Sequence, residues 1–145
     1  MKVIQNIVLA ALCGALLSCG SVSNRENSRL MQEAQRLIQQ KPDSALALLQ
    51  AVDVPSLSNS ENAEYTLLLV QAKDKAGQDI TADTAVFAAR DFFVAAENDE
   101  KAAFASFYAG RGLQEQGNTG DALKAYLEAG RRAHTLGRVN TNFVF

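Results

Sequence analysis

The chain has 145 residues, of which 48% are hydrophobic and 21% are charged, enough for one domain with a modest core. A formal net charge of −2 and an isoelectric point near 5.4 give no electrostatic basis for binding DNA or RNA, so we expect neither as a partner. Only two prolines and no tryptophan occur, and alanine, leucine and glutamine are plentiful. Because this composition favours helices over strands, we expect an all-α fold.

The N-terminal segment is apolar and leads to a cysteine. Lys2 is the only charged residue among the first 24, and the apolar run over residues 3–17 is short for a membrane span. The run leads into Leu-Leu-Ser-Cys at residues 16–19, which resembles the bacterial lipobox. The resemblance implies a lipoprotein signal peptide over residues 1–18 and a lipid, such as palmitate, on Cys19. The alternative is an ordinary signal peptide with an incidental cysteine.

The lipobox resemblance also implies what becomes of the two cysteines and where in the cell the protein is located. Cys13 would leave with the signal peptide and Cys19 would carry the lipid, so the mature domain would have no disulfide and no sulfur ligand for a metal. Residues 20–27 are small and polar and predict a flexible tether. In the similar lipoproteins of Bacteroidota an acidic run after the cysteine accompanies surface display, whereas here Glu26 is the first acid. We therefore expect a periplasm-facing, lipid-anchored protein of the bacterial cell envelope, with the inner or outer membrane left open.

Two helices are predicted in the first part of the domain. Apolar residues at spacings of three and four indicate a helix over residues 28–40 that ends at Lys41-Pro42. A second helix begins there, with Asp43 or Ser44 as its cap. Residues 53–60, with one proline and three serines, form the loop that follows.

Two further helices are predicted in the middle of the chain. The third, capped by Asn59 or Ser60 and continuing to Gly77, is apolar on nearly all sides in its first half. We therefore expect it to lie at the centre of the domain. The fourth helix is predicted over residues 81–96.

A helical hairpin is predicted over residues 102–132. Its first helix, capped by Asn98 or Asp99, is interrupted after Leu113 by the turn sequence GNTGD, and the last helix covers residues 119–137. Gly110 and Ala122 are the positions at which the two backbones can approach closely. A single hairpin cannot bury both of its apolar faces, so it implies neighbours of the same kind.

This hairpin resembles a tetratricopeptide repeat. Gly110, Ala122 and the aromatic Tyr126 fall at the intervals of that family's pattern, and Ala129 supplies a further small residue. The unit is degenerate, because Ser106, Ala109 and Leu113 stand where the pattern usually has Trp, Leu and Tyr, and no proline closes it. Alanines 45, 85 and 122 open three successive second helices at intervals slightly longer than the family's usual repeat. The resemblance implies about three antiparallel hairpins stacked as a short right-handed solenoid over residues 28–137, followed by an irregular apolar tail at 138–145.

The chain offers little for catalysis. His134 is the single histidine, and at the end of the last helix it is better interpreted as a partner of the helix dipole than as a general base. Glu97, Asp99 and Glu100 are interpreted as a helix end followed by a cap region, and the turn at residues 117–121 lacks the lysine of a phosphate-binding loop. We expect no catalytic residues, no metal and no cofactor, and therefore no enzyme.

The candidate binding surface is the inner face of the stack, because the first helix of each hairpin lines that face. When the region around Ala72 is laid on the region around Gly110, Lys73 and Arg111 take equivalent inward positions, where two cations could hold a ligand carboxylate. This arrangement resembles the way in which some family members hold peptide C-termini. The alternative is that both are solvated charges. The candidate groove comprises Thr66, Leu69, Lys73, Phe104, Phe107, Arg111 and Gln114.

The last helix has more apolar surface than its own hairpin requires. At 100° per residue its apolar residues cover an arc of roughly 200°, extended by Leu123 and Leu127. We expect this flank to be covered by self-association, by another protein, or by Phe143-Val144-Phe145 folding back, with a truncated reading frame as the explanation.

The sequence is compatible with two functions. The first is a non-catalytic, lipid-anchored repeat module that binds an unidentified protein or peptide. The second is that the chain is a truncated or N-terminal part of a larger repeat-containing regulator or carbohydrate-uptake lipoprotein.

Overall fold

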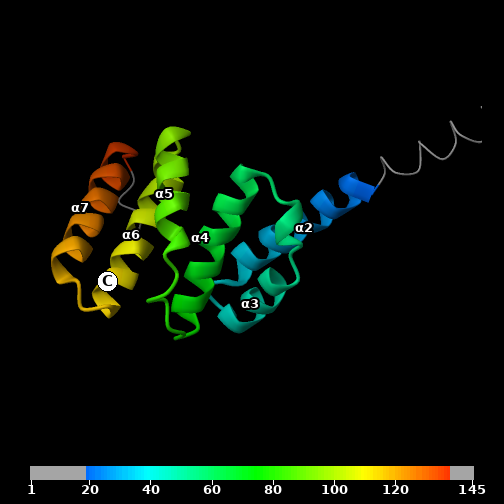
Figure 1. Cartoon of the computed structure of the whole chain (residues 1–145), viewed down its shortest axis with the longest axis horizontal. Coiled ribbons are helices and arrows are strands. Elements are labelled where there is room, and N and C mark those ends of the chain that lie inside the picture. Colours follow the sequence, from blue (N-terminus) through cyan, green and yellow to red (C-terminus); the bar gives the residue numbers. More distant parts are fainter. Residues whose placement is uncertain (1–18, 138–145) are drawn as a thin grey trace, which may run out of the picture.

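The computed structural model describes residues 19–137, and within them the fold is all-helical, as expected (Figure 1). The predictions made for residues 1–18 and 138–145 lie outside the described residues. Six α-helices and one 3-10 turn occur in this part of the chain: α2 (Cys19–Leu37), α3 (Pro42–Gln50), η1 (Val54–Ser56), α4 (Asn59–Lys75), α5 (Ala85–Ala95), α6 (Asp99–Glu115) and α7 (Thr119–Thr135).

The helices pack in chain order. Each helix from α2 to α7 contacts the next one, and the first helices of successive pairs also meet, α2 with α4 and α4 with α6. Figure 1 shows the result as a row that runs from α2 at one side to α7 at the other. Helices α4, α5 and α6 lie in the middle of the row and contact one another, so they connect its two ends.

Helix α4 lies at the centre, as its apolar sequence predicts. Leu68 and Ala72 on one side belong to a core formed with α2 and α3. Ala63, Leu67 and Val70 on another side belong to a core formed with α5 and α6. A helix that is buried from two sides needs apolar residues around most of its circumference, which explains the composition of α4.

The second and third helix pairs repeat at a constant interval. Helices α4 and α6 are each 17 residues long and begin at Asn59 and Asp99. Helices α5 and α7 end at Ala95 and Thr135, so the same distance along the chain separates their ends. We call the step from Asn59 to Asp99 the repeat interval. The predicted alignment of the Ala72 region on the Gly110 region is two residues shorter than this interval and is therefore wrong.

One turn geometry ends α4, α5 and α6. The residue after the C-cap has a positive φ in each case: Gly77 (70°), Glu97 (55°) and Gly117 (78°). The next N–H then donates to the carbonyl oxygen five residues earlier, at 2.9 Å in all three turns, which is a Schellman motif. Asn98 and Asn118 follow two of these turns and accept a backbone N–H to cap α6 and α7. The expected cap of α6 at Asn98 is thus confirmed.

The predicted tether over residues 20–27 is wrong, because these residues form the first part of α2. The side chain of Asn27 explains part of the difference between the predicted tether and the observed helix. Its amide is 2% exposed, accepts the backbone N–H of Asp53 at 3.0 Å, and donates to Ser56 Oγ at 2.9 Å. This polar side chain is buried because it attaches the η1 turn to α2, a role that composition alone does not reveal.

Three predicted helix starts also differ from the structure. Helix α3 begins at Pro42 without a side-chain cap, so neither Asp43 nor Ser44 caps it. Helix α4 is capped by Ser58, which forms a capping box with Glu61. Helix α5 begins at residue 85 instead of 81, since residues 76–84 form a loop whose Ile80 side chain is buried in the core.

Gly110 gives α6 and α7 their close approach, as predicted. A Cβ atom at this position would lie 2.7 Å from Cε1 and 2.8 Å from Cδ1 of the Tyr126 ring. Ala122, the other small residue predicted at this interface, is 2% exposed. The absence of a side chain at Gly110 therefore leaves the space against α6 that the Tyr126 ring fills.

Candidate binding groove

A groove of about 920 Å³ runs along α2, α4 and α6, which are the first helices of their pairs. It is lined by Gln35 of α2, with Ile38 and Gln39 directly after that helix; Glu64, Leu67, Leu68, Gln71, Asp74 and Lys75 of α4; Asn98, Glu100, Lys101, Phe104, Phe107, Tyr108, Arg111 and Gln114 at and along α6; and Tyr126 of α7.

The repeat interval explains why α4 and α6 share this lining. Five groove positions of α4 have counterparts one repeat interval later that also line the groove: 64 with 104, 67 with 107, 68 with 108, 71 with 111, and 74 with 114. Equivalent faces of equivalent helices therefore lie along one surface.

Aromatic rings form much of the apolar part of the groove. Phe107 contacts Tyr108 edge to face at a centroid distance of 5.1 Å and Tyr126 at 5.6 Å. The Tyr126 hydroxyl donates to Oε1 of Gln114 at 2.7 Å, which fixes the ring across α6 and α7. Burial raises the pKa of Tyr108 well above its ordinary value, so this phenol stays neutral at physiological pH. The aromatic part is therefore uncharged.

Two ion pairs connect α4 to α6 within the groove. Lys101 Nζ lies 2.8 Å from Glu64 Oε2. Arg111 Nη2 lies 2.7 Å from Asp74 Oδ1 and 3.3 Å from Glu115 Oε1. The hydrogen bond to Asp74 raises the pKa of Arg111. Both of these cations are thus neutralised by carboxylates of the same chain.

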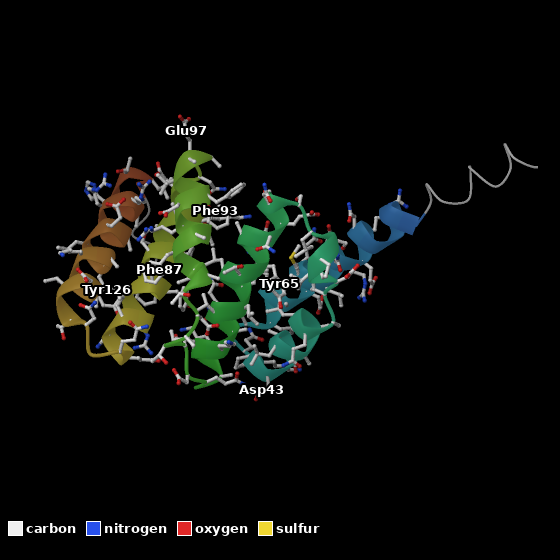
Figure 2. All side chains as sticks on the ribbon, in the orientation of Figure 1. Asp43, Tyr65, Phe87, Phe93, Glu97 and Tyr126 are labelled. Atoms are coloured by element: carbon white, nitrogen blue, oxygen red, sulfur yellow. The ribbon has the colours of Figure 1, made fainter. Side chains whose placement is uncertain are left out.

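The predicted groove residues separate into two groups. Phe104, Phe107, Arg111 and Gln114 do line the groove. Thr66 and Leu69 lie instead in a second pocket of about 200 Å³, which Tyr65 also lines. Lys73 binds Asp83 at 2.7 and 3.0 Å and does not line the groove. The predicted pair of cations is therefore wrong, and Figure 2 shows Tyr65 and Tyr126 at separate places along the row of helices.

Gln71 and Asp74 line the groove but were not among the predicted groove residues, because the predicted register was wrong. With the repeat interval of the structure, Arg111 corresponds to Gln71 and Lys73 corresponds to Leu113. Helices α4 and α6 have equal lengths, and a glycine follows each of them, Gly77 and Gly117. These two glycines lie one repeat interval apart and are the sequence signal for it. The α2 side of the groove had no such signal. Helix α2 begins one repeat interval before α4, at Cys19, but it ends at Leu37, which is two residues closer to the end of α4, and no glycine follows it before α3.

Chemical groups for catalysis or metal binding are sparse in the described part of the chain. No group of three or more His, Cys, Asp or Glu residues is positioned for a metal ion there. His134 is exposed near the end of α7, and Arg132 binds Asp99 and Glu128, each at 2.6 Å. None of the helices in residues 19–137 has the length and apolarity that crossing a bilayer requires.

Comparison with known proteins gives no relative: no family model, no curated protein and no solved structure matches this chain significantly.

Proposed function

We propose that this chain is a non-catalytic interaction module of the tetratricopeptide-repeat type, attached to a membrane of the bacterial envelope by a lipid on Cys19. Its groove binds a segment of another protein that presents apolar side chains and little charge. The single observation that carries this proposal is the repeat interval, which lays equivalent faces of α4 and α6 along one groove. Repetition of this kind builds the concave binding surfaces of helical solenoids.

The chemistry of the groove supports a ligand of low charge. Lys101 and Arg111 are engaged by Glu64 and Asp74, so an acidic ligand could use either of these two cations only by displacing a carboxylate of the chain itself. The aromatic rings offer apolar contact area, and amide side chains along the groove can both donate and accept hydrogen bonds. A peptide that places apolar side chains on the rings and backbone amides against the glutamines satisfies both features.

A peptide-library selection with the full chain tests the groove. We expect enrichment of uncharged peptides with at least one large apolar residue. The variant Gln71→Glu/Gln114→Glu keeps side-chain size but adds two charges to the groove, and should bind the selected peptides on the order of tenfold more weakly. The matched control Gln50→Glu/Gln78→Glu changes two exposed glutamines outside the groove and should bind as the wild type does. Equal weakening by both variants, or selection of acidic peptides by the wild type, would contradict the proposal.

Membrane attachment has a separate test. Cys19→Ala should abolish lipid labelling and the processing that follows lipidation, so that the mature membrane-anchored form is lost, whereas Cys13→Ala should change neither. Unaltered processing and membrane retention of Cys19→Ala would refute the anchor without affecting the groove.

A further inference from the structure

The outer face of α7 carries an apolar strip that its own hairpin leaves uncovered. Leu123 and Leu127 are 57% and 64% exposed, the highest values among the large hydrophobic residues of the described chain. Gly120 and Gly130 continue the strip at its two ends, and a Cβ atom at either glycine would meet nothing within 4 Å. Glycine inside a helix is less stable than alanine, and the packing of a single chain gives no reason for Gly130.

The strip has the same order in both directions. Gly120, Leu123, Leu127 and Gly130 are spaced by three, four and three residues, with glycine at each end and leucine at each inner position. In an antiparallel pair of identical helices, Leu123 of one copy therefore meets Leu127 of the other, and Gly120 meets Gly130. A two-fold symmetric interface requires this kind of self-complementary surface. The glycines would let the two backbones approach closely.

A row of charges beside the strip is self-complementary as well. Asp121, Lys124, Glu128 and Arg131 have the same three, four, three spacing and alternate in sign. When the row is reversed, every acid faces a base: Asp121 faces Arg131 and Lys124 faces Glu128. In a parallel two-fold pair the row would face the other flank of the partner's strip, so only an antiparallel pair brings the row against itself. The charge pattern therefore selects the antiparallel arrangement.

These charged side chains can exchange their partners at little cost. Lys124 binds Asp121 at 2.7 Å, with 79% and 52% of the two side chains exposed. Arg131 binds Glu128 at 2.5 Å, with 66% and 31% exposed. Exposed ion pairs on a helix surface contribute little to stability, and Glu128 keeps its second contact, to Arg132, so replacing these pairs with contacts between two copies loses little.

We infer that the outer face of α7 binds a second copy of this chain, with the two α7 helices antiparallel about a two-fold axis near the middle of the helix. The dimer leaves the groove open, because Tyr126 is the residue of α7 that lines it, and the strip does not include Tyr126. Each dimer therefore presents two grooves, and a ligand with two binding segments gains affinity from their linkage.

Sedimentation of the full chain, detergent-solubilised where it is membrane-bound, tests this inference. Arg131→Glu places like charges opposite each other at two symmetry-related sites, and should raise the dimer dissociation constant about tenfold or more. The double variant Asp121→Lys/Arg131→Glu restores opposite signs and should recover most of the affinity. Lys41→Glu, a charge reversal at an exposed residue outside α7, is the matched control and should behave as the wild type does.

Gly130→Leu provides a second test that does not depend on charge. The added side chain has open space within a single chain, so helix content should be retained, but it separates the two helices and should leave the chain monomeric. A wild-type chain that is monomeric throughout the concentration range would overturn the inference. So would a dimer indifferent to both Arg131→Glu and Gly130→Leu, or a dimer that appears only after residues 138–145 are removed, since those residues would then be the occupant.

Discussion

Arg111 of α6 binds the carboxylate of Asp74 of α4 at 2.7 Å, although 37 residues separate them in the chain. The Asp74 side chain is only 12% exposed and that of Arg111 is 34% exposed, so the pair is held within the groove and not at its outer edge. This contact joins the two groove helices and at the same time occupies Arg111, one of the cations that a ligand carboxylate could otherwise use. The groove therefore favours ligands that do not compete for Arg111.

Removing Asp74 should change what the groove accepts. In Asp74→Asn the guanidinium of Arg111 keeps only Glu115 as an acidic partner among the described residues, so it becomes available to a ligand carboxylate. We expect tighter binding of peptides with a free C-terminal carboxylate than of the same peptides amidated, measured by fluorescence anisotropy. The loss of this partly buried ion pair should cost about 1 kcal/mol of stability. Asp83→Asn frees Lys73 outside the groove and should give no such gain.

Gly110→Leu should destabilise the α6 and α7 pair. The Cβ atom alone would lie 2.7 Å from the Tyr126 ring, so the branched side chain must displace it, at a cost of about 2–3 kcal/mol. Thermal melting followed by circular dichroism measures the loss. Because Tyr126→Ala removes the clashing ring, Gly110→Leu should cost less in that background than in the wild type. Equal costs in the two backgrounds would show that the two residues do not interact.

Glu97→Gly should stabilise the chain. Glu97 is the one non-glycine residue with a positive φ in the described part of the chain, and it lies at the tip of the α5–α6 turn, pointing away from the helices (Figure 2). Glycine adopts this conformation without the steric penalty of a Cβ atom, so the gain should be about 1 kcal/mol, read as a higher urea midpoint. Gly117→Ala, at the same position of the next turn, should lower the midpoint by a similar amount. Opposite signs for the two variants are the expected result, and a shared sign would contradict it.

Asn27→Leu should detach the η1 turn from α2. The substitution leaves the N–H of Asp53 without its acceptor at a partly buried place, which should cost about 1 kcal/mol. Asn24→Leu, three residues earlier on the exposed side of α2, should change stability little. Hydrogen exchange at the Asp53 amide would show whether the loss is local to this turn.

The sequence predicted the helices better than their register. Apolar periodicity located all six helices of the described chain and the central position of α4, because burial from two sides requires an apolar circumference. The interval between pairs was missed because it depends on the turns. Glu97 takes a conformation usually reserved for glycine, and the loop over residues 76–84 lengthens one connection without any counterpart after α6. A shift of two residues then assigned Lys73 to the groove in place of Gln71.

Site-specific photo-crosslinking in cells tests the groove most directly. A photoreactive residue at Gln71 faces the groove, whereas the same residue at Gln50 of α3 is exposed outside it. We expect a discrete adduct from position 71 that is reduced by a selected uncharged peptide, and no such adduct from position 50. Absence of any adduct from position 71, or identical adducts from both positions, would contradict the assignment of this groove as the binding site.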